Sequence, residues 1–121
     1  MAAAPHMLVA IGLPAGAGQV LLHWQIDGAP CWARMWARVQ EVALLAVVNG
    51  NMQVNDVANV VSAATAAAHT SISVSCAAGL PLAAVKTAAA VAVAAAATLA
   101  AAPAALPAAT VQALANAAAR L

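Results

Sequence analysis

The chain of 121 residues is long enough for one domain of ordinary size; 66% of its residues are hydrophobic and only 6% are charged. The formal net charge of +1 excludes a nucleic-acid-binding protein, which needs many basic side chains to neutralise phosphates, and Phe and Tyr are absent. High hydrophobicity with few charges also excludes intrinsic disorder.

The first thirty residues predict a strand and two breaks. Residues 1–6 are interpreted as a short extension, and the apolar run 7–13 has the length and β-branching of a buried strand. Three Pro and Gly residues within 14–18 end that strand. Residues 19–26 fit either a second strand or the start of a helix, and 27–30 breaks this segment in both interpretations.

A helix is predicted to begin at Pro30, because a proline in the first turn lacks only an N–H that would have no partner there. Its core face is marked by residues at helical spacing, which are Trp32, Met35, Trp36 and Val39. The apolar run 42–48, closed by Asn49 and Gly50, is typical of a strand buried on both faces. A helix from Pro30 to Val48 fits the same residues.

The second half of the chain predicts further alternation. Asn55 is a good N-cap for a helix to about His69, and the apolar stripe of that helix is Val57, Val60, Val61, Ala64 and Ala68. Residues 71–76 alternate polar and apolar side chains, as a half-buried strand does. Pro81 opens a third helix, 91–93 fits a short strand, and 107–121 closes the chain as a helix.

Together these elements predict a single α/β domain over residues 7–121. Its mostly parallel sheet would contain the strands 7–13, 42–48 and 71–76, with helices on both faces. The alternative is an all-helical bundle, which is favoured by the 41 alanines and excluded if residues 71–76 pair in a sheet.

The apolar surplus raises the question of a membrane. Residues 82–102 contain one charge, Lys86, and the mean hydropathy of the chain is +0.95. Alanine is nearly neutral for membrane insertion, so a spanning helix is not the preferred interpretation. No Lys or Arg precedes the apolar run 7–17, so we expect no secretory signal, a cytoplasmic protein and free thiols. A homo-oligomer would cover the apolar surface instead.

Few residues offer chemistry. The potential metal ligands are scattered without the close pairs of a zinc or iron site, so no metal is expected; they are His6, His23, His69, Cys31 and Cys76. The three carboxylates, Asp27, Glu41 and Asp56, form no hydrolytic motif, and the loop 14–18 lacks the third glycine of a dinucleotide-binding fingerprint. We therefore expect no organic cofactor, and the sequence leaves open whether the chain is an enzyme.

Cys76 is the candidate catalytic residue. It ends the predicted strand 71–76 and shortly precedes a helix, whose N–H groups would lower the pKa of the thiol. The alternative is a small buried hydrophobic residue. Cys31 has a similar electrostatic argument but no strand end beneath it, and His69 is expected at the opposite sheet edge, too far to act as a base.

This order of elements resembles the DsrE/TusD-like sulfur-carrier family. The likeness covers a first strand and Pro/Gly loop over 7–18, a second apolar strand closed by Gly50, and a strand that ends in Cys76 followed by small residues. The basic residues that often follow the family's cysteine are replaced here by residues 79–82. The stretch 42–74 also resembles the strand-loop-helix-strand order of an ACT regulatory domain.

The first resemblance implies sulfur relay. The Cys76 thiolate would accept a sulfane sulfur from a persulfide donor protein, hold it as Cys-S-SH and pass it to an acceptor protein, without metal or cofactor, in a homo-oligomer. The ACT-like resemblance implies a small-molecule-binding regulatory module. A third interpretation is a hydrophobic structural, oligomeric or membrane-associated subunit.

Overall fold

The computed structural model describes the backbone of residues 15–121 and the side chains of residues 32–121. Within this part the elements are helical throughout: α2 (Ala15–Val48), a short 3-10 helix η1 (Val54–Asp56), α3 (Val57–Ala77), α4 (Leu82–Ala101) and α5 (Ala108–Ala118). The strand predicted over 7–13 lies outside the described residues.

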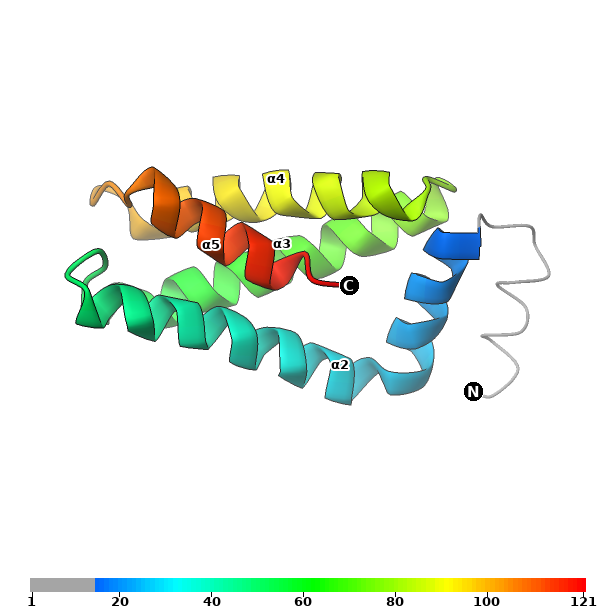
Figure 1. Cartoon of the computed structure of the whole chain (residues 1–121), viewed down its shortest axis with the longest axis horizontal. Coiled ribbons are helices and arrows are strands. Elements are labelled where there is room, and N and C mark those ends of the chain that lie inside the picture. The colour runs from blue at the N-terminus through cyan, green and yellow to red at the C-terminus, as the bar shows by residue number, and fades with distance from the viewer. Residues whose placement is uncertain (1–14) are drawn as a thin grey trace.

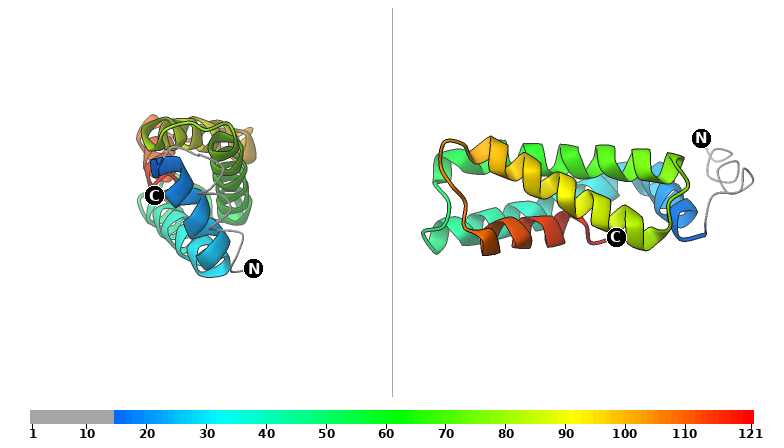
Figure 2. Two further views of the ribbon diagram at one scale, coloured as in Figure 1. Left: turned by 90° about the vertical axis from the view of Figure 1, so that its right-hand side faces the viewer. Right: turned by 90° about the horizontal axis from the view of Figure 1, so that it is seen from above.

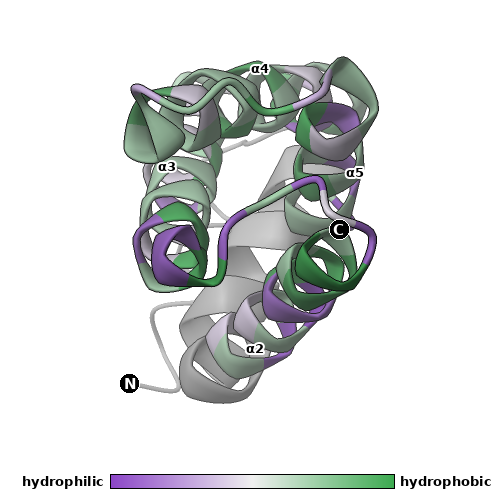
Figure 3. Cartoon of the chain, turned by 90° about the vertical axis from the view of Figure 1, so that its left-hand side faces the viewer, coloured by the Kyte–Doolittle hydropathy of each residue, from purple (hydrophilic) through white to green (hydrophobic). Residues whose placement is uncertain are grey.

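The four long helices form an antiparallel bundle. Each helix packs against the next along the chain, and α5 closes the ring by packing against α2. Figure 1 shows that α2 and α4 run in one direction while α3 and α5 run in the other. Viewed along the bundle in Figure 3, α4 lies opposite α2, and α3 and α5 lie on the two sides between them. The core is therefore the space that the four helices enclose.

The predicted α/β fold with a parallel sheet is wrong, and the all-helical alternative is correct. Residues 42–48 form the last turns of α2, 71–76 belong to α3, and 91–93 lie within α4. The alternation in 71–76 also satisfies a helical period, because Ile72, Ser75 and Cys76 are three and four residues apart and all buried. The strand-loop-helix-strand order of an ACT domain over 42–74 has no counterpart either.

The predicted break at 27–30 is a bend instead of an end. The α2 helix continues through these residues, and Figure 1 shows it turning sharply in its N-terminal half. Gly28 and Pro30 account for a bend in this region, because proline removes a helical hydrogen bond and crowds the preceding turn. After the bend, Met35 and Val39 face the core as predicted, and Trp32 and Trp36 pack on its edge.

Small residues bring α3 and α4 together. The buried residues of α4 recur at every fourth position, as Val85, Ala89, Val93, Ala97 and Ala101. The facing side of α3 has the same spacing in Val60, Ala64, Ala68, Ile72 and Cys76. Ridges of this spacing pack with the helices crossing obliquely, and Figure 2 shows α4 running diagonally over α3. Alanine at half of these positions lets the backbones approach closely.

Two glycines end the helices that precede the hairpin turns. Gly50 and Gly79 have positive φ angles of 76° and 77°, which side chains with a Cβ rarely adopt. The next residues donate back across each helix end, Asn51 N–H to the Ala46 carbonyl at 2.7 Å and Leu80 N–H to the Ser75 carbonyl at 3.1 Å. These are Schellman motifs, and they place α3 against α2 and α4 against α3.

Two of the four predicted helix starts are correct, and the start at Pro30 is wrong because α2 begins at Ala15. Pro81 immediately precedes α4 and Pro107 immediately precedes α5, as the sequence indicates. Asn55 does not cap α3, since it lies within η1, and Asp56 occupies the N-cap position without a side-chain hydrogen bond. The stripe of Val60, Val61, Ala64 and Ala68 is buried as predicted.

Arg38 fastens the C-terminal end of α5 to α2. Its Nε donates to the Ala117 carbonyl at 3.2 Å, and a terminal guanidinium nitrogen donates to the Arg120 carbonyl at 3.0 Å. These carbonyls are at a helix C-terminus, where a positive charge is favourable. We expect Arg38→Ala to lower the free energy of unfolding by about 1 kcal/mol, because the charge-assisted bonds are replaced by bonds to water.

Urea unfolding followed by circular dichroism measures this effect. Arg34→Ala is the matched control, because Arg34 lies one turn earlier on α2 and is exposed. Equal effects of the two substitutions would show that the contact with α5 contributes nothing specific.

Candidate functional site

The structure places Cys76 in the last turns of α3 with its side chain 0% exposed. Burial raises the pKa of its thiol above the ordinary value, because desolvation disfavours the thiolate. The expected stabilisation of a Cys76 thiolate by a helix N-terminus is also wrong. Cys76 lies near the C-terminal end of α3, where the helix dipole opposes negative charge. This surrounding favours a protonated, packed thiol.

Cys76 should therefore resist alkylation in the folded protein. We expect iodoacetamide at pH 7.5 to label it at least about 100-fold more slowly than in urea, because labelling requires opening of the core. Peptide mass mapping separates Cys76 from Cys31. Equal labelling rates with and without urea would contradict the buried position.

The raised pKa of Cys76 also gives a pH dependence. The unfolded chain releases the thiol proton above roughly pH 8.5, whereas the folded chain retains it, so stability falls as pH rises through this range. Cys76→Ala should remove this component of the slope, and urea midpoints between pH 7 and 10 measure it.

His69 cannot serve as a base for Cys76. The two residues are seven positions apart on α3, a rise of about 10 Å along the helix axis. The imidazole of His69 instead meets the Trp32 ring edge-on at 5.2 Å between centroids, and Trp32 lies 6.3 Å from Trp36. This aromatic cluster joins α2 to α3.

The remaining predicted site residues are not brought together. The side chains of His6, His23, Asp27 and Cys31 lie outside the described part of the chain, and residues 15–18 of the predicted loop 14–18 form the start of α2 instead. Among residues 32–121, no group of three or more His, Cys, Asp and Glu side chains could hold a metal ion.

A surface feature that the sequence interpretation missed is the outward side of α4. The exposed residues there also recur at every fourth position: Ala83, Thr87, Val91, Ala95 and Leu99, called here the α4 outer stripe. Val91 is 66% exposed and Leu99 is 77% exposed. A helix that is apolar on its inner and outer sides is normally covered on both. The four-residue spacing of this stripe is visible in the sequence, but its alanine and threonine side chains differ little in hydrophobicity from their neighbours.

The threonines of α4 keep their hydroxyl groups within the helix. Thr87 donates to the Ala83 carbonyl at 3.0 Å, and Thr98 donates to the Ala94 carbonyl at 2.8 Å. Each hydroxyl donor is therefore already satisfied, and the side chain presents its methyl group outward. Covering this surface costs little desolvation of donors, so the stripe is chemically suited to an apolar contact.

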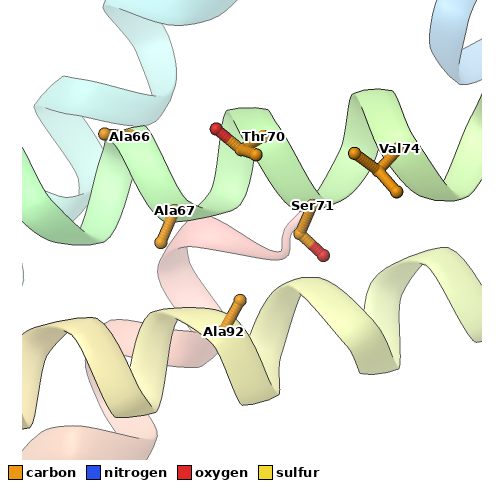
Figure 4. Close-up of a pocket in the computed structure, with 6 residues that line it drawn as sticks. All are labelled: Ala66, Ala67, Thr70, Ser71, Val74 and Ala92. Carbon is orange, nitrogen blue, oxygen red and sulfur yellow. The ribbon is translucent and has the colours of Figure 1, made fainter.

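A shallow groove continues this surface toward α3. Figure 4 shows Ala67 and Ser71 on α3 pointing toward α4, and Ala92 on α4 pointing back. The residues that line this α3–α4 groove are Ala66, Ala67, Thr70, Ser71, Val74 and Ala92. None of them is charged. The outer stripe and the groove together form a strip about two helices wide.

The other helices expose polar side chains together with some apolar ones. The exposed polar residues are Asn59, Ser62, His69, Thr70 and Ser73 on α3, and Arg34, Gln40 and Glu41 on α2. The exposed large apolar residues are Leu44, Leu45 and Val48 on α2, and Val74 on α3. On α5, Gln112 donates to Asn116 at 2.9 Å on the exposed side. In Figure 3 most of α4 and of α3 is hydrophobic in colour, whereas hydrophilic residues lie in the loops and on α2 and α5. Among α2–α5, only α4 exposes no charged or amide side chain, so its outer side is called here the apolar side of the bundle.

Comparison with known proteins gave no relative: no family model, no curated protein and no solved structure matches the chain. Two segments, Val54–Ala77 and Leu82–Ala101, are long and apolar enough to cross a membrane by length and composition. The cores of soluble bundles contain helices of the same kind, and 44% of the first window is buried inside the structure against 22% of the second. Of the two helices, α4 therefore has the smaller buried share.

Proposed function

We propose that this protein is a structural helical-bundle subunit that associates with copies of itself through its apolar side. The observation that carries the proposal is the α4 outer stripe, with Val91 and Leu99 both more than half exposed on a helix whose opposite side is already buried in the core. Association would remove this surface from water at a gain of about 25 cal/mol per Å² of apolar area.

The polar side of α3 favours a second copy over a lipid bilayer as the cover. A membrane hairpin of α3 and α4 would expose Asn59, Ser62 and Ser73 to lipid, where unpaired polar groups are costly. A second copy placed on α4 leaves these side chains in water. Sulfur relay stays a prediction that the burial of Cys76 does not favour, and its sheet-based setting in the DsrE-like fold has no counterpart in residues 15–121.

Multi-angle light scattering tests self-association directly. We expect a dimer or higher oligomer at concentrations of about 10–100 µM, estimated from the modest area available. A monomer at 100 µM in detergent-free buffer would contradict the proposal. Protein that is insoluble without detergent and binds phosphatidylcholine vesicles would contradict it in favour of membrane association.

A further inference from the structure

The α4 outer stripe has a spacing that allows it to pack against itself. Its exposed residues follow the same four-residue repeat as the buried residues that already pack α4 on α3. Helix ridges with this repeat fit the grooves of a helix with the same repeat. The structure therefore contains, on the outside of α4, a second copy of the pattern that holds the bundle together.

We infer that two copies of the chain associate by antiparallel packing of α4 on α4, with Val91 at the twofold axis. This inference rests on the proposed self-association and assigns its contact surface and register. An antiparallel pair overlaps most when the axis passes the middle of α4 (Leu82–Ala101), which falls between Val91 and Ala92. Val91 is the more exposed of the two, whereas Ala92 lines the α3–α4 groove.

The register places complementary shapes together. Val91 meets the partner's Val91, and Thr87 meets the partner's Ala95 on each side of the axis. Small residues on both sides of Val91 let the two helices approach as closely as α3 and α4 do. The only charged side chain of α4, Lys86, lies five residues from the axis, so the two lysines are separated by about 15 Å along the helices.

The available area matches what a stable dimer needs. A helix of 20 residues is about 30 Å long, and a strip two helices wide is about 20 Å across. That strip provides about 600 Å² per copy, or about 1,200 Å² in total, at the lower limit for specific interfaces. Inclusion of the α3–α4 groove with Val74 in the strip is required to reach this size.

Cysteine cross-linking tests the surface and the register. Val91→Cys in the full chain, mildly oxidised at 50 µM, is expected to give mostly disulfide-linked dimer, because residues on the axis lie within disulfide range. Gln40→Cys on the exposed side of α2, the helix opposite α4, is the matched control, and the wild-type chain measures the background from Cys31. We expect at least about tenfold more dimer from Val91→Cys than from Gln40→Cys.

Two further variants separate an antiparallel pair from a parallel one. Thr87→Cys and Ala95→Cys should cross-link when mixed and not when alone, because like positions would lie about 12 Å apart, beyond disulfide reach. Cross-linking of each variant with itself would overturn the antiparallel register. A dimer in light scattering without cross-linking at Val91→Cys would overturn this inference while leaving self-association intact, and a monomer in light scattering would overturn both.

Discussion

Leu114→Ala should lower the free energy of unfolding by about 2–5 kcal/mol. Leu114 is 0% exposed and is the only large apolar side chain that α5 contributes to the buried core, beside Thr110, Ala115 and Ala118. A helix of 11 residues is too short to be stable alone, so its attachment depends on this contact. A domain of this size has roughly 5–15 kcal/mol in total.

Leu45→Ala is the matched control for Leu114→Ala. Leu45 lies on α2 and is 59% exposed, so the same chemical change should cost less than about 1 kcal/mol there. Urea unfolding of both variants, monitored by circular dichroism, gives the comparison. A smaller effect at Leu114 than at Leu45 would mean that α5 does not complete the core.

The sequence was informative where hydrophobic contrast marks a helical face. The stripe Val60, Val61, Ala64 and Ala68 and the prolines before α4 and α5 each predicted the structure correctly. Short apolar runs were not informative, because 42–48 fits a buried strand and a helix equally well. The run is helical because it continues the helical pattern of Trp32 to Val39 as part of one long helix, α2.

The segment 71–76 shows how a strand pattern is overridden. Its serines and β-branched residues favour a strand locally, but it follows fourteen residues of alanine-rich helix. The helix continues through it to Ala77 and is stopped by the motif at Gly79. Packing of Ile72 and Cys76 in the core then fixes the helical state. The candidate site failed because the accessibility predicted for Cys76 required a strand end, and its predicted low pKa required an accessible thiol beside the N–H groups of the following helix, whereas Cys76 is buried within α3 and its pKa is raised.

The α4 outer stripe could not be recognised from composition. Alanine accounts for 12 of the 20 residues of α4, so inner and outer positions differ little in hydrophobicity. Only the fold shows which of the two four-residue repeats is exposed. The position of Val91, near the middle of the helix and facing outward, then becomes meaningful.

Opposite charges at Val91 should control dimer formation. In the proposed register Val91→Glu brings two carboxylates together at the twofold axis, and Val91→Lys brings two ammonium groups together. Both homodimers should weaken by at least about 100-fold, because like charges that lose water in contact repel and remain unpaired. Val91 is 66% exposed in one copy, so the fold of the monomer should tolerate both changes.

A mixture of the two variants should dimerise again, since the carboxylate introduced in one copy would face the ammonium group introduced in the other and form an ion pair. Light scattering of the separate and mixed proteins at 50 µM measures the recovery, and circular dichroism confirms that each variant is folded. Gln40→Glu and Gln40→Lys are the controls, and they should remain dimeric alone because Gln40 is exposed on α2, the helix opposite α4. Recovery only on mixing is specific to a residue on the symmetry axis, because a residue away from the axis would meet a different position of the partner and not its own counterpart. Dimers of Val91→Glu alone as stable as wild type would place the contact elsewhere on the bundle.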